Sequence, residues 1–571
     1  MTSRPPWLRY YGAVLPSLVY PDGSLSDAVL ATASRAPDAP ALSFLGATIS
    51  YRQLEQAVHR CAAALASLGV RHGDRVAIAL PTCPQGVIAV YAANRLGAVA
   101  VMVHPLSTAP EIEAYVAASR SRVAVTLDLC FPRFSAARAG TGLEHVIVTR
   151  ISDTLGPFAR VLYRVTRGRR APVVPREAGV RWWRPLMAGS GTAVPPSTGR
   201  PEDLAAILFS GGTTGAPKGV MLSNRNLVAE GMEAAAWVGL GAGDSMLAAL
   251  PLFHGVGLGL CINSVLLSGG KSILVPIFSA ANVATAIRKE RPTLMVGVPT
   301  LYDSLTRDRS LATADLSSLR AAFSGADTLP RPVKDRFERL VAARGGSVKL
   351  LEGYGLTEAV TAIMAMPLGE YREGSVGVPF PDMQGAIFRP GTAEELPAGE
   401  EGEVCVAGPS VMMGYLDDPE ATAQTLRPHP DGRTWLHTGD LGRRDQDGFF
   451  SFTVRLKRMI KSSGFNVYPG QVEDVLYQHP AVREACVIGI PDASQGERVV
   501  ACVVPQRGVA TGPELERELI AFCRERLIKW SCPRAVTFRR DLPKTRLAKV
   551  DYRLLTQEVM QDAPAEPARV E

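Results

Sequence analysis

The N-terminal part of the chain alternates between two hydrophobic periodicities. Residues 50–70 ("SYRQLEQAVHRCAAALASLGV") and 84–98 ("PQGVIAVYAANRLGA") carry apolar residues at helical spacing. Each is followed by a short, continuous apolar run, at 74–81 ("DRVAIALP") and 99–105 ("VAVMVHP"). Apolar runs of this length between amphipathic helices are typical of buried parallel strands. We therefore expect an α/β fold in which helices cover both faces of mainly parallel sheets.

The pattern changes twice along the chain, which predicts its division into domains. Between about 376 and 455, short alternating runs are separated by Gly, Pro and Asp, as in a small antiparallel β unit resembling a barrel. From 456 onward, helical and strand patterns mix in a compact α+β tail. We expect a large N-terminal domain at 1–455, which includes the β-rich subdomain, and a small C-terminal domain at 456–571.

Composition narrows the class of protein. The chain has 571 residues, 46% hydrophobic and 20% charged, and a net charge of +7, which gives no reason to expect a nucleic-acid partner. Its nine cysteines include no C-x-x-C pair, so we expect buried thiols in a reducing compartment. We find no signal peptide and no apolar run long enough to span a bilayer. The expected location is the cytoplasm.

Residues 158–187 stand out because they carry eight arginines and a single acid, Glu177. Apolar residues fall at helical spacing near the start of this segment, beside Arg160 and Arg164. A basic amphipathic helix can lie on an anionic membrane, here the inner membrane face. The simpler interpretation, which we favour, is a helix docked on the protein by its apolar stripe.

Residues 209–219, "FSGGTTGAPKG", follow the apolar run "LAAIL" and combine four glycines, two threonines and a lysine. Glycines allow backbone N–H groups to approach an anion, and threonine hydroxyls add donors. The segment is not a Walker loop, because Pro217 precedes Lys218 and Gly219 follows it. It nevertheless suits a polyphosphate bound between a strand and a loop.

This segment and four others resemble the acyl-adenylate-forming (AMP-binding) superfamily, and most closely its bacterial medium- and long-chain fatty-acyl-CoA synthetases. The other four occur in the family's order: "EGYGLTEA" (352–359), "WLHTGDLGRRDQDGFF" (435–450), "VRLKRMIKSSGFNVYPGQVED" (454–474) and "LPKTRLAKVD" (542–551). The resemblance covers roughly residues 25 to 555. It implies a two-step reaction, in which a carboxylate attacks the α-phosphate of ATP and a thiol, commonly that of CoA, then displaces AMP.

The resemblance also implies roles for individual residues at the nucleotide. Thr357 would bind the α-phosphate and Glu358 would hold Mg²⁺, a hard cation that prefers carboxylate oxygen. Tyr354 would lie against adenine, and Asp440, beside Arg455, would accept hydrogen bonds from the ribose. The candidate cofactor-binding residues are Ser210, Gly211, Gly212, Thr213, Thr214, Gly215, Lys218, Gly325, Ala326, Tyr354, Asp440, Arg455, Lys461 and Gly464. Taken singly, Asp440 could be a turn residue and Glu358 a helix-start carboxylate.

The C-terminal domain carries the implied adenylation lysine, Lys549, which would bridge the carboxylate and α-phosphate oxygens as a flexible cation. In this family the domain rotates between the two half-reactions, and Lys457 occupies the hinge position. In the second pose, Gly464 would leave space for a pantetheine arm. The chain has Ala548 where the family usually has Gly, so the lysine loop is expected to sit slightly differently.

The acid is indicated by "LPLFHGVGLGL" (250–260). Relatives that activate amino acids usually place an aspartate just after this aromatic position, whereas this chain has His254 and Gly255, which argues against an α-amino acid as substrate. His254 resembles the gating residue of acyl- and aryl-CoA ligases. The alternative interpretation is that His254 is a packed, hydrogen-bonded histidine of the core. The apolar or small segments 296–302 and 323–329 suit an alkyl or aryl acid. We expect a medium- or long-chain fatty acid, with an aryl acid as the alternative.

The acceptor is expected from outside the chain, since only 22 residues follow Lys549. CoA is the first expectation. An adenylating enzyme that loads an acyl carrier protein or forms an amide is a second, and a catalytically silent acyl- or nucleotide-binding protein is a third. The sequence does not indicate an oligomeric state.

Overall fold

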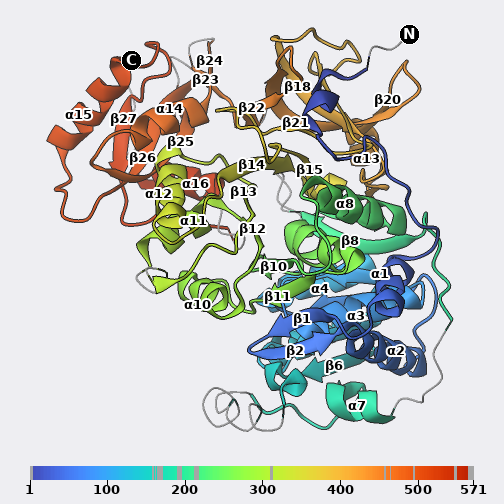
Figure 1. The fold of residues 1–571 in the computed structure, drawn as a ribbon. Helices are drawn as coiled ribbons and strands as arrows, with labels where there is room; N and C mark the ends of the chain where they lie inside the picture. Colours follow the sequence, from blue (N-terminus) through green and yellow to red (C-terminus); the bar gives the residue numbers. More distant parts are fainter. Residues whose placement is uncertain are drawn as a thin grey trace.

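The fold is that of a computed structural model of the whole chain (Figure 1). The residues it describes are 4–156, 160, 163, 172–189, 196–210, 218–308, 311, 313–455, 458–462, 465–492, 496–545 and 550–562. Within them the α/β class expected from the sequence is confirmed, with two large mixed sheets, one antiparallel sheet and one smaller α+β part.

The first large sheet has nine strands, and its centre is parallel. Antiparallel strands extend it at both edges. In spatial order its strands are β16 (Val378–Pro379), β15 (Ala362–Ala365), β14 (Leu350–Gly355), β13 (Ala321–Ser324), β12 (Leu294–Gly297), β10 (Ser245–Ala248), β11 (Lys271–Leu274), β1 (Pro40–Phe44) and β2 (Ala47–Ser50).

The second large sheet has eight strands and is parallel from β8 to β7. Two antiparallel strands lie at one edge. Its order is β19 (Gly414–Tyr415), β9 (Lys218–Ser223), β8 (Leu204–Ser210), β4 (Val99–Met102), β3 (Arg75–Ala79), β5 (Val123–Leu127), β6 (His145–Thr149) and β7 (Val180–Trp182).

The third sheet is antiparallel throughout, as the alternating pattern after residue 376 predicts. It contains β17 (Gln384–Phe388), β18 (Glu401–Ala407), β21 (Thr434–Arg444) and β20 (Leu426–Pro428), with β22 (Phe450–Arg455) paired to β21. The fourth sheet belongs to the C-terminal part and contains β24 (Phe465–Val467), β23 (Ile460–Ser462), β26 (Gly496–Pro505), β25 (Val482–Asp492) and β27 (Ala535–Phe538). Figure 1 shows this part in orange to red, away from the blue N-terminal helices.

The helices fill the layers between and around the sheets. In chain order they are η1 (Pro6–Tyr10), α1 (Leu25–Arg35), α2 (Tyr51–Ser67), α3 (Pro84–Arg95), α4 (Ala109–Ser119), α5 (Phe131–Arg138), η2 (Ile151–Thr154), α7 (Trp183–Gly189), α8 (Asn224–Trp237), the π-helix η4 (Val256–Asn263), α9 (Ser264–Ser268), α10 (Ala280–Glu290), α11 (Pro299–Arg307), α12 (Arg331–Ala342), η6 (Thr357–Ala359), α13 (Pro419–Thr425), α14 (Pro469–Tyr477), α15 (Pro513–Arg524) and α16 (Tyr552–Asp562).

Local sequence signals explain where these helices begin. The Ser50 side chain accepts from the backbone N–H of Gln53, whose side chain in turn accepts from Ser50 N–H, so α2 starts with a capping box. The same arrangement starts α8 at Ser223 with Asn226 in place of glutamate or glutamine. These polar caps satisfy N–H groups that the helix itself leaves without partners.

The two large sheets share one central core. That core joins buried residues of both sheets with those of α1, α2, α3, α8 and α9, which lie between them. A second cluster packs α10, α11 and α12 on the outer face of the nine-stranded sheet, and a third packs α4 and α5 on the outer face of the other. Helices therefore cover both faces of each large sheet, as expected from the alternation of patterns.

Two sequence expectations concern membranes. Among the described residues, no helix combines the length and apolar character needed to cross a bilayer. Most of the first half of the basic segment 158–187 lies outside the described residues. Arg160, which is described, donates hydrogen bonds to the carbonyls of Ser152 and Leu155, and Tyr163 packs on the central core.

Candidate active site

A cavity of about 760 Å³ lies where strands of the nine-stranded sheet reach their carboxyl ends. It is lined there by Gly297, Gly325 and Gly355, which end or follow β12, β13 and β14. Residues of β18, β20, β21 and α13, together with residues 550–553 of the C-terminal part, complete the wall. Carboxyl ends of parallel strands are where ligands bind in open α/β sheets.

Tyr354 and Asp440 meet at the polar end of this cavity. The Tyr354 hydroxyl, at the end of β14, donates a hydrogen bond of 2.7 Å to Asp440 Oδ2, on β21. Asp440 is only 3% exposed, and the Tyr354 ring stacks on Phe452 at a centroid distance of 6.3 Å. Arg455 is the backbone partner of Asp440 across the β21–β22 pair. A buried carboxylate beside an aromatic ring is an arrangement that can hold a ribose and a base.

Glu403 holds the bulge in β21 that carries Asp440, where the β18–β21 register shifts. One oxygen of its buried carboxylate accepts from Gly439 N–H at 2.9 Å, and the other lies 2.8 Å from His437 Nδ1. Burial raises the pKa of Glu403, but the hydrogen bond and charge of His437 outweigh it and keep that pKa below its ordinary value. His437 Nε2 lies 3.0 Å from His429 Nε2. The network therefore reaches from His429 to the bulge that carries Asp440.

The same network contains a group of metal-ligating residues, Glu403, Cys405 and His437, whose ligand atoms lie within 4.8 Å of one another. The carboxylate of Glu403 and the ring of His437 are already engaged with each other, with Gly439 and with His429. Holding the bulge that carries Asp440 accounts for their arrangement, and we assign no metal to them.

Glu358 and Lys218 lie on either side of one tyrosine. Glu358, in η6, accepts a hydrogen bond of 2.9 Å from the hydroxyl of Tyr415. Lys218 Nζ lies 4.7 Å from the centroid of the Tyr415 ring and 3.8 Å from Asp418 Oδ2. Glu358, Lys218 and Tyr415 all line the cavity, together with Thr357. The arrangement offers a carboxylate for a hard cation and an ammonium group for a polyphosphate.

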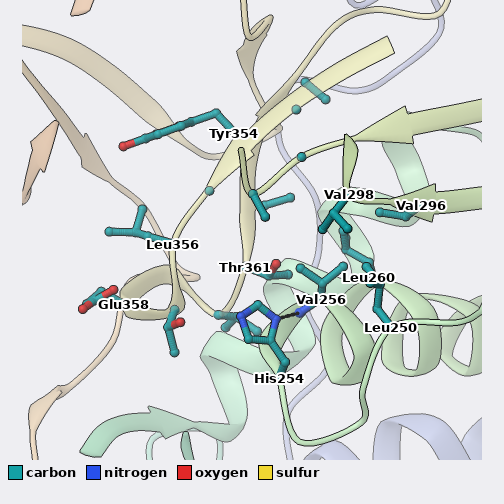
Figure 2. Close-up of a pocket in the computed structure, with 18 of the residues that line it drawn as sticks. Leu250, His254, Val256, Leu260, Val296, Val298, Tyr354, Leu356, Glu358 and Thr361 are labelled. Atoms are coloured by element: carbon teal, nitrogen blue, oxygen red, sulfur yellow. Dashed lines mark hydrogen bonds between the residues drawn. The ribbon is translucent and has the colours of Figure 1, made fainter. Parts of the chain in front are cut away.

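His254 lies at the entrance to the apolar part of the cavity. Figure 2 shows its ring between the loop of Glu358 and the apolar side chains of Leu250 and Leu260. Its Nδ1 accepts from the N–H of Val256 at 3.3 Å, which leaves Nε2 as the donor of a neutral ring. The π-helix η4 begins here, and π-helical turns are frequent at functional sites.

Gly255 is required next to His254 because another loop approaches it closely. A Cβ at residue 255 would lie 1.9 Å from the carbonyl oxygen of Val360. Val360 itself has φ 62°, an uncommon conformation for a β-branched residue. Such local strain is maintained only where the surroundings enforce it, and it gathers at functional sites.

The structure places the remaining predicted residues as follows. Ser210, Gly325 and Ala326 line the cavity, and Ala326 has φ 72°. Lys461 is exposed on β23 and is not among the cavity-lining residues, while its backbone N–H donates to Glu497. Gly211, Gly212, Thr213, Thr214, Gly215, Lys457, Gly464, Ala548 and Lys549 lie outside the described residues, as does the side chain of Arg455. Their roles stay predictions.

Sequence reasoning missed Tyr415, Glu403 and His437. Tyr415 is 57 positions from its partner Glu358, and Glu403 is 36 positions from Gly439. "GEV" and "MMGY" read as ordinary strand and turn residues. His437 is adjacent to the "TGD" motif, and that proximity was the one signal that could have singled it out.

Comparisons with known proteins agree with this geometry. The family model "AMP-binding enzyme" matches residues 29–416, and "AMP-binding enzyme C-terminal domain" matches residues 471–549. A long-chain-fatty-acid–CoA ligase of Bacillus subtilis (strain 168) is 38% identical over 567 residues, covering 98% of this chain and 99% of that protein. A feruloyl-CoA synthase of Amycolatopsis sp is 34% identical over 522 residues, 91% of this chain and 95% of that protein.

Among solved structures, ATP-bound MatB from Rhodopseudomonas palustris has a TM-score of 0.81 and 28% identity, covering 95% of this chain and 99% of that one. The resemblance found in the five sequence motifs is thus confirmed over nearly the whole length. The chain belongs to the AMP-binding enzyme family.

Proposed function

We propose that the protein is an ATP- and Mg²⁺-dependent acyl-CoA ligase that activates a medium- or long-chain fatty acid through acyl-AMP. In the first step a carboxylate oxygen bonds to the α-phosphorus of ATP while the bond to pyrophosphate breaks. In the second, the CoA sulfur bonds to the acyl carbon and AMP leaves. The similar fatty-acid–CoA ligase, which covers nearly the whole chain, supports this choice of acid.

One observation carries the proposal: a single cavity has a polar end and an apolar end. The polar end holds Thr357, Glu358, Tyr354 and Asp440, and the apolar end is lined by residues such as Leu294 and Val296. His254 stands between the two. An acid bound with its chain in the apolar end would present its carboxylate to the polar end, where the nucleotide would lie.

The described residues suit the nucleotide and the metal. Asp440, held by Tyr354 and the Glu403 network, would accept hydrogen bonds from the ribose. Thr357 would donate to the α-phosphate, and Lys218 would neutralise charge on the outer phosphates. Thr213 and Thr214, which lie outside the described residues, would donate hydrogen bonds to the same phosphates. Glu358 would hold Mg²⁺, which when bound supplies further neutralisation of the phosphate oxygens.

The neutral ring of His254, with Nε2 as donor, would orient the carboxylate on its way to the phosphate. Lys549 would stabilise the charge that develops on the carboxylate and α-phosphate oxygens in the first step. Rotation of the C-terminal part would then replace Lys549 with the loop at 461–464 for the second step, with Lys461 and Gly464 at the pantetheine arm.

Two further points extend the proposal. The acceptor is CoA, with an acyl carrier protein or an amine as alternatives from the same first step. The protein acts in the cytoplasm, and the basic segment 158–187 could bring it to the inner membrane face, where a fatty acid would partition.

The test is a substrate panel with purified protein, ATP and Mg²⁺, using saturated acids from acetate to palmitate and several aryl acids, each with and without CoA. AMP is followed over time and the acyl product is identified by mass. CoA-dependent turnover of a saturated acid of eight or more carbons is the expected result.

Other results would overturn specific parts of the proposal. If turnover is highest with ferulate or benzoate, the substrate is an aryl acid rather than a fatty acid, which is the alternative favoured by the similar feruloyl-CoA synthase. If acyl-AMP forms but is not transferred to CoA, the acceptor is a carrier protein or an amine rather than CoA. No AMP with any acid would remove the enzymatic assignment.

A further inference from the structure

The apolar end of the cavity runs along one face of the nine-stranded sheet. Leu294, Val296 and Val298, two residues apart on and after β12, all line it. Leu294 and Val296 lie two apart on the strand itself, so their side chains point to the same face. Met295 lines the cavity as well. Leu294 is the first residue of β12, and Val298 follows its last. The passage therefore extends from the carboxyl edge of the sheet to its amino edge.

The inner end of this passage lies at the amino ends of three neighbouring strands. Leu294 pairs in register with Ala321 on β13 and with Met246 on β10, and all three line the cavity. Val238, just after α8, also lines the cavity. Four residue steps at about 3.3 Å give a depth of about 13 Å from Val298 to Leu294.

A polar clasp, formed by Arg320, Asp244 and Thr293, closes the sheet edge next to this inner end. Arg320 donates to both carboxylate oxygens of Asp244 at 2.7 Å, and Thr293 donates to the same carboxylate at 2.9 Å. Arg320 and Thr293 immediately precede the inner lining residues Ala321 and Leu294 in the chain. Asp244 lies two positions before Met246. Arg320 also donates to the carbonyl oxygens of Val238 and Gly239.

The clasp sits at the protein surface. The side chain of Arg320 is 34% exposed and that of Asp244 is 17% exposed. The clasp ties the end of α8 to the starts of β10, β12 and β13, at the same sheet edge as the inner lining residues Met246, Leu294 and Ala321.

We infer that this clasp and Ala321 set the longest acyl chain that the enzyme accepts in an extended form. An extended chain advances about 1.3 Å per carbon, given a C–C bond of about 1.5 Å, so the passage takes about ten carbons. The acid that fits best is therefore a saturated chain of about ten to twelve carbons, and a simple aryl acid leaves most of the passage unfilled. This inference rests on the proposed function.

The experiment compares kcat/KM for saturated acids of six to eighteen carbons in the wild-type protein and three variants. Ala321→Met places a longer side chain at the inner end, Arg320→Ala opens the clasp, and Arg291→Ala is the control. Arg291 and Asp315 form a surface ion pair, 52% and 49% exposed, whose residues are not among those lining the cavity. Circular dichroism and thermal unfolding verify that each variant is folded.

For the wild type we expect a maximum at about ten to twelve carbons. Ala321→Met should lower the maximum by about two to four carbons and leave the shortest acids within about twofold. Arg320→Ala should raise the ratio of kcat/KM for hexadecanoate to that for decanoate about tenfold, and Arg291→Ala should not change the ratio. If Arg320→Ala does not fold, Ala321→Met alone decides.

Two results would contradict the inference in different ways. If the wild type turns over fatty acids and the folded variants keep its chain-length profile, the inner end and clasp do not limit the chain, while the proposed function stands. If the wild type forms no AMP with any fatty acid, the proposed function fails and the inference fails with it.

Discussion

The hydroxyl of Tyr415 donates a hydrogen bond of 2.9 Å to the carboxylate of Glu358, while the face of its ring lies 4.7 Å from the ammonium group of Lys218. One side chain on β19 thus positions both the candidate metal ligand and a candidate phosphate ligand. β19 pairs with β9, the strand that carries Lys218, which brings Tyr415 and Lys218 together.

Tyr415→Phe removes the hydroxyl and keeps the ring. A hydrogen bond to a charged group contributes about 1.5 kcal/mol or more, so we expect KM for MgATP to rise about tenfold. The contact between Lys218 and the ring should remain. Tyr415→Leu should raise KM for MgATP further, because it also removes the ring that contacts Lys218. Steady-state kinetics at several Mg²⁺ concentrations measure both.

The matched control is Tyr371→Phe, since that exposed phenol also donates to a carboxylate, Glu352, and neither residue lines the cavity. Equal KM values in wild type and Tyr415→Phe would show that Glu358 does not need its tyrosine partner.

Glu403 is a positioning residue, because both oxygens of its carboxylate are engaged within the protein, one by Gly439 N–H and the other by His437. Glu403→Gln should loosen the bulge that carries Asp440, lower kcat/KM for ATP about tenfold, and reduce the enzyme's discrimination between ATP and 2′-deoxy-ATP. A loss of general stability would lower both rates equally and leave the discrimination intact. Glu395→Gln, in a surface ion pair with Arg444, is the control.

Gly255→Ala tests the close approach beside His254. The new methyl group would lie 1.9 Å from the Val360 carbonyl oxygen, so that carbonyl would have to move. Overpacking of this kind costs about 1–3 kcal/mol, and we expect a lower Tm together with loss of turnover. Gly241→Ala, where a Cβ meets nothing within 4 Å, should behave as wild type. An active, equally stable Gly255→Ala protein would contradict the geometry.

Glu233 predicts a specific pH dependence of stability. It is fully buried on α8 near Tyr20, and burial above all raises its pKa to about 8. Its neighbours Asp382 and Glu230 are also acidic, and burial raises the pKa of Glu230 well above its ordinary value. Because the folded state keeps the Glu233 proton that the unfolded state releases above its lower pKa, stability falls as the pH rises from about 5 to 8.

Glu233→Gln should therefore make the free energy of unfolding fall less steeply with pH. The slope should decrease by up to about 1.4 kcal/mol per pH unit, which is the limit for one proton. Denaturant unfolding at pH 5, 6.5 and 8 measures it. Both proteins should be most alike near pH 5 and differ most at pH 8. Parallel stability curves over this range would show that Glu233 is ionised in the folded protein.

All nine cysteines are free and buried, as their scattered positions led us to expect. Burial raises the pKa values of several of these thiols, that of Cys61 among them. Native protein should consequently react slowly with a thiol reagent, and nine thiols should react after denaturation. Rapid labelling of the native protein would indicate local opening.

Much of the architecture followed from local patterns. The segments 50–70 and 84–98, with apolar residues at helical spacing, contain the helices 51–67 and 84–95, and the apolar runs after them became β3 and β4. The antiparallel sheet after residue 376 also followed from its alternation. Such features depend on residues close in the chain, whose periodicity decides which face is buried.

The sequence by itself determined the α/β class, the family and several of the residues that line the polar end of the cavity, because motifs such as "EGYGLTEA" and "HTGD" are short and contiguous. Only the tertiary structure decided that Tyr354 meets Asp440, 86 positions away, and that Arg320 meets Asp244, 76 positions away. Contacts of this kind depend on which strands become neighbours and in what register. That order is set by packing of the whole core, and no local spacing encodes it.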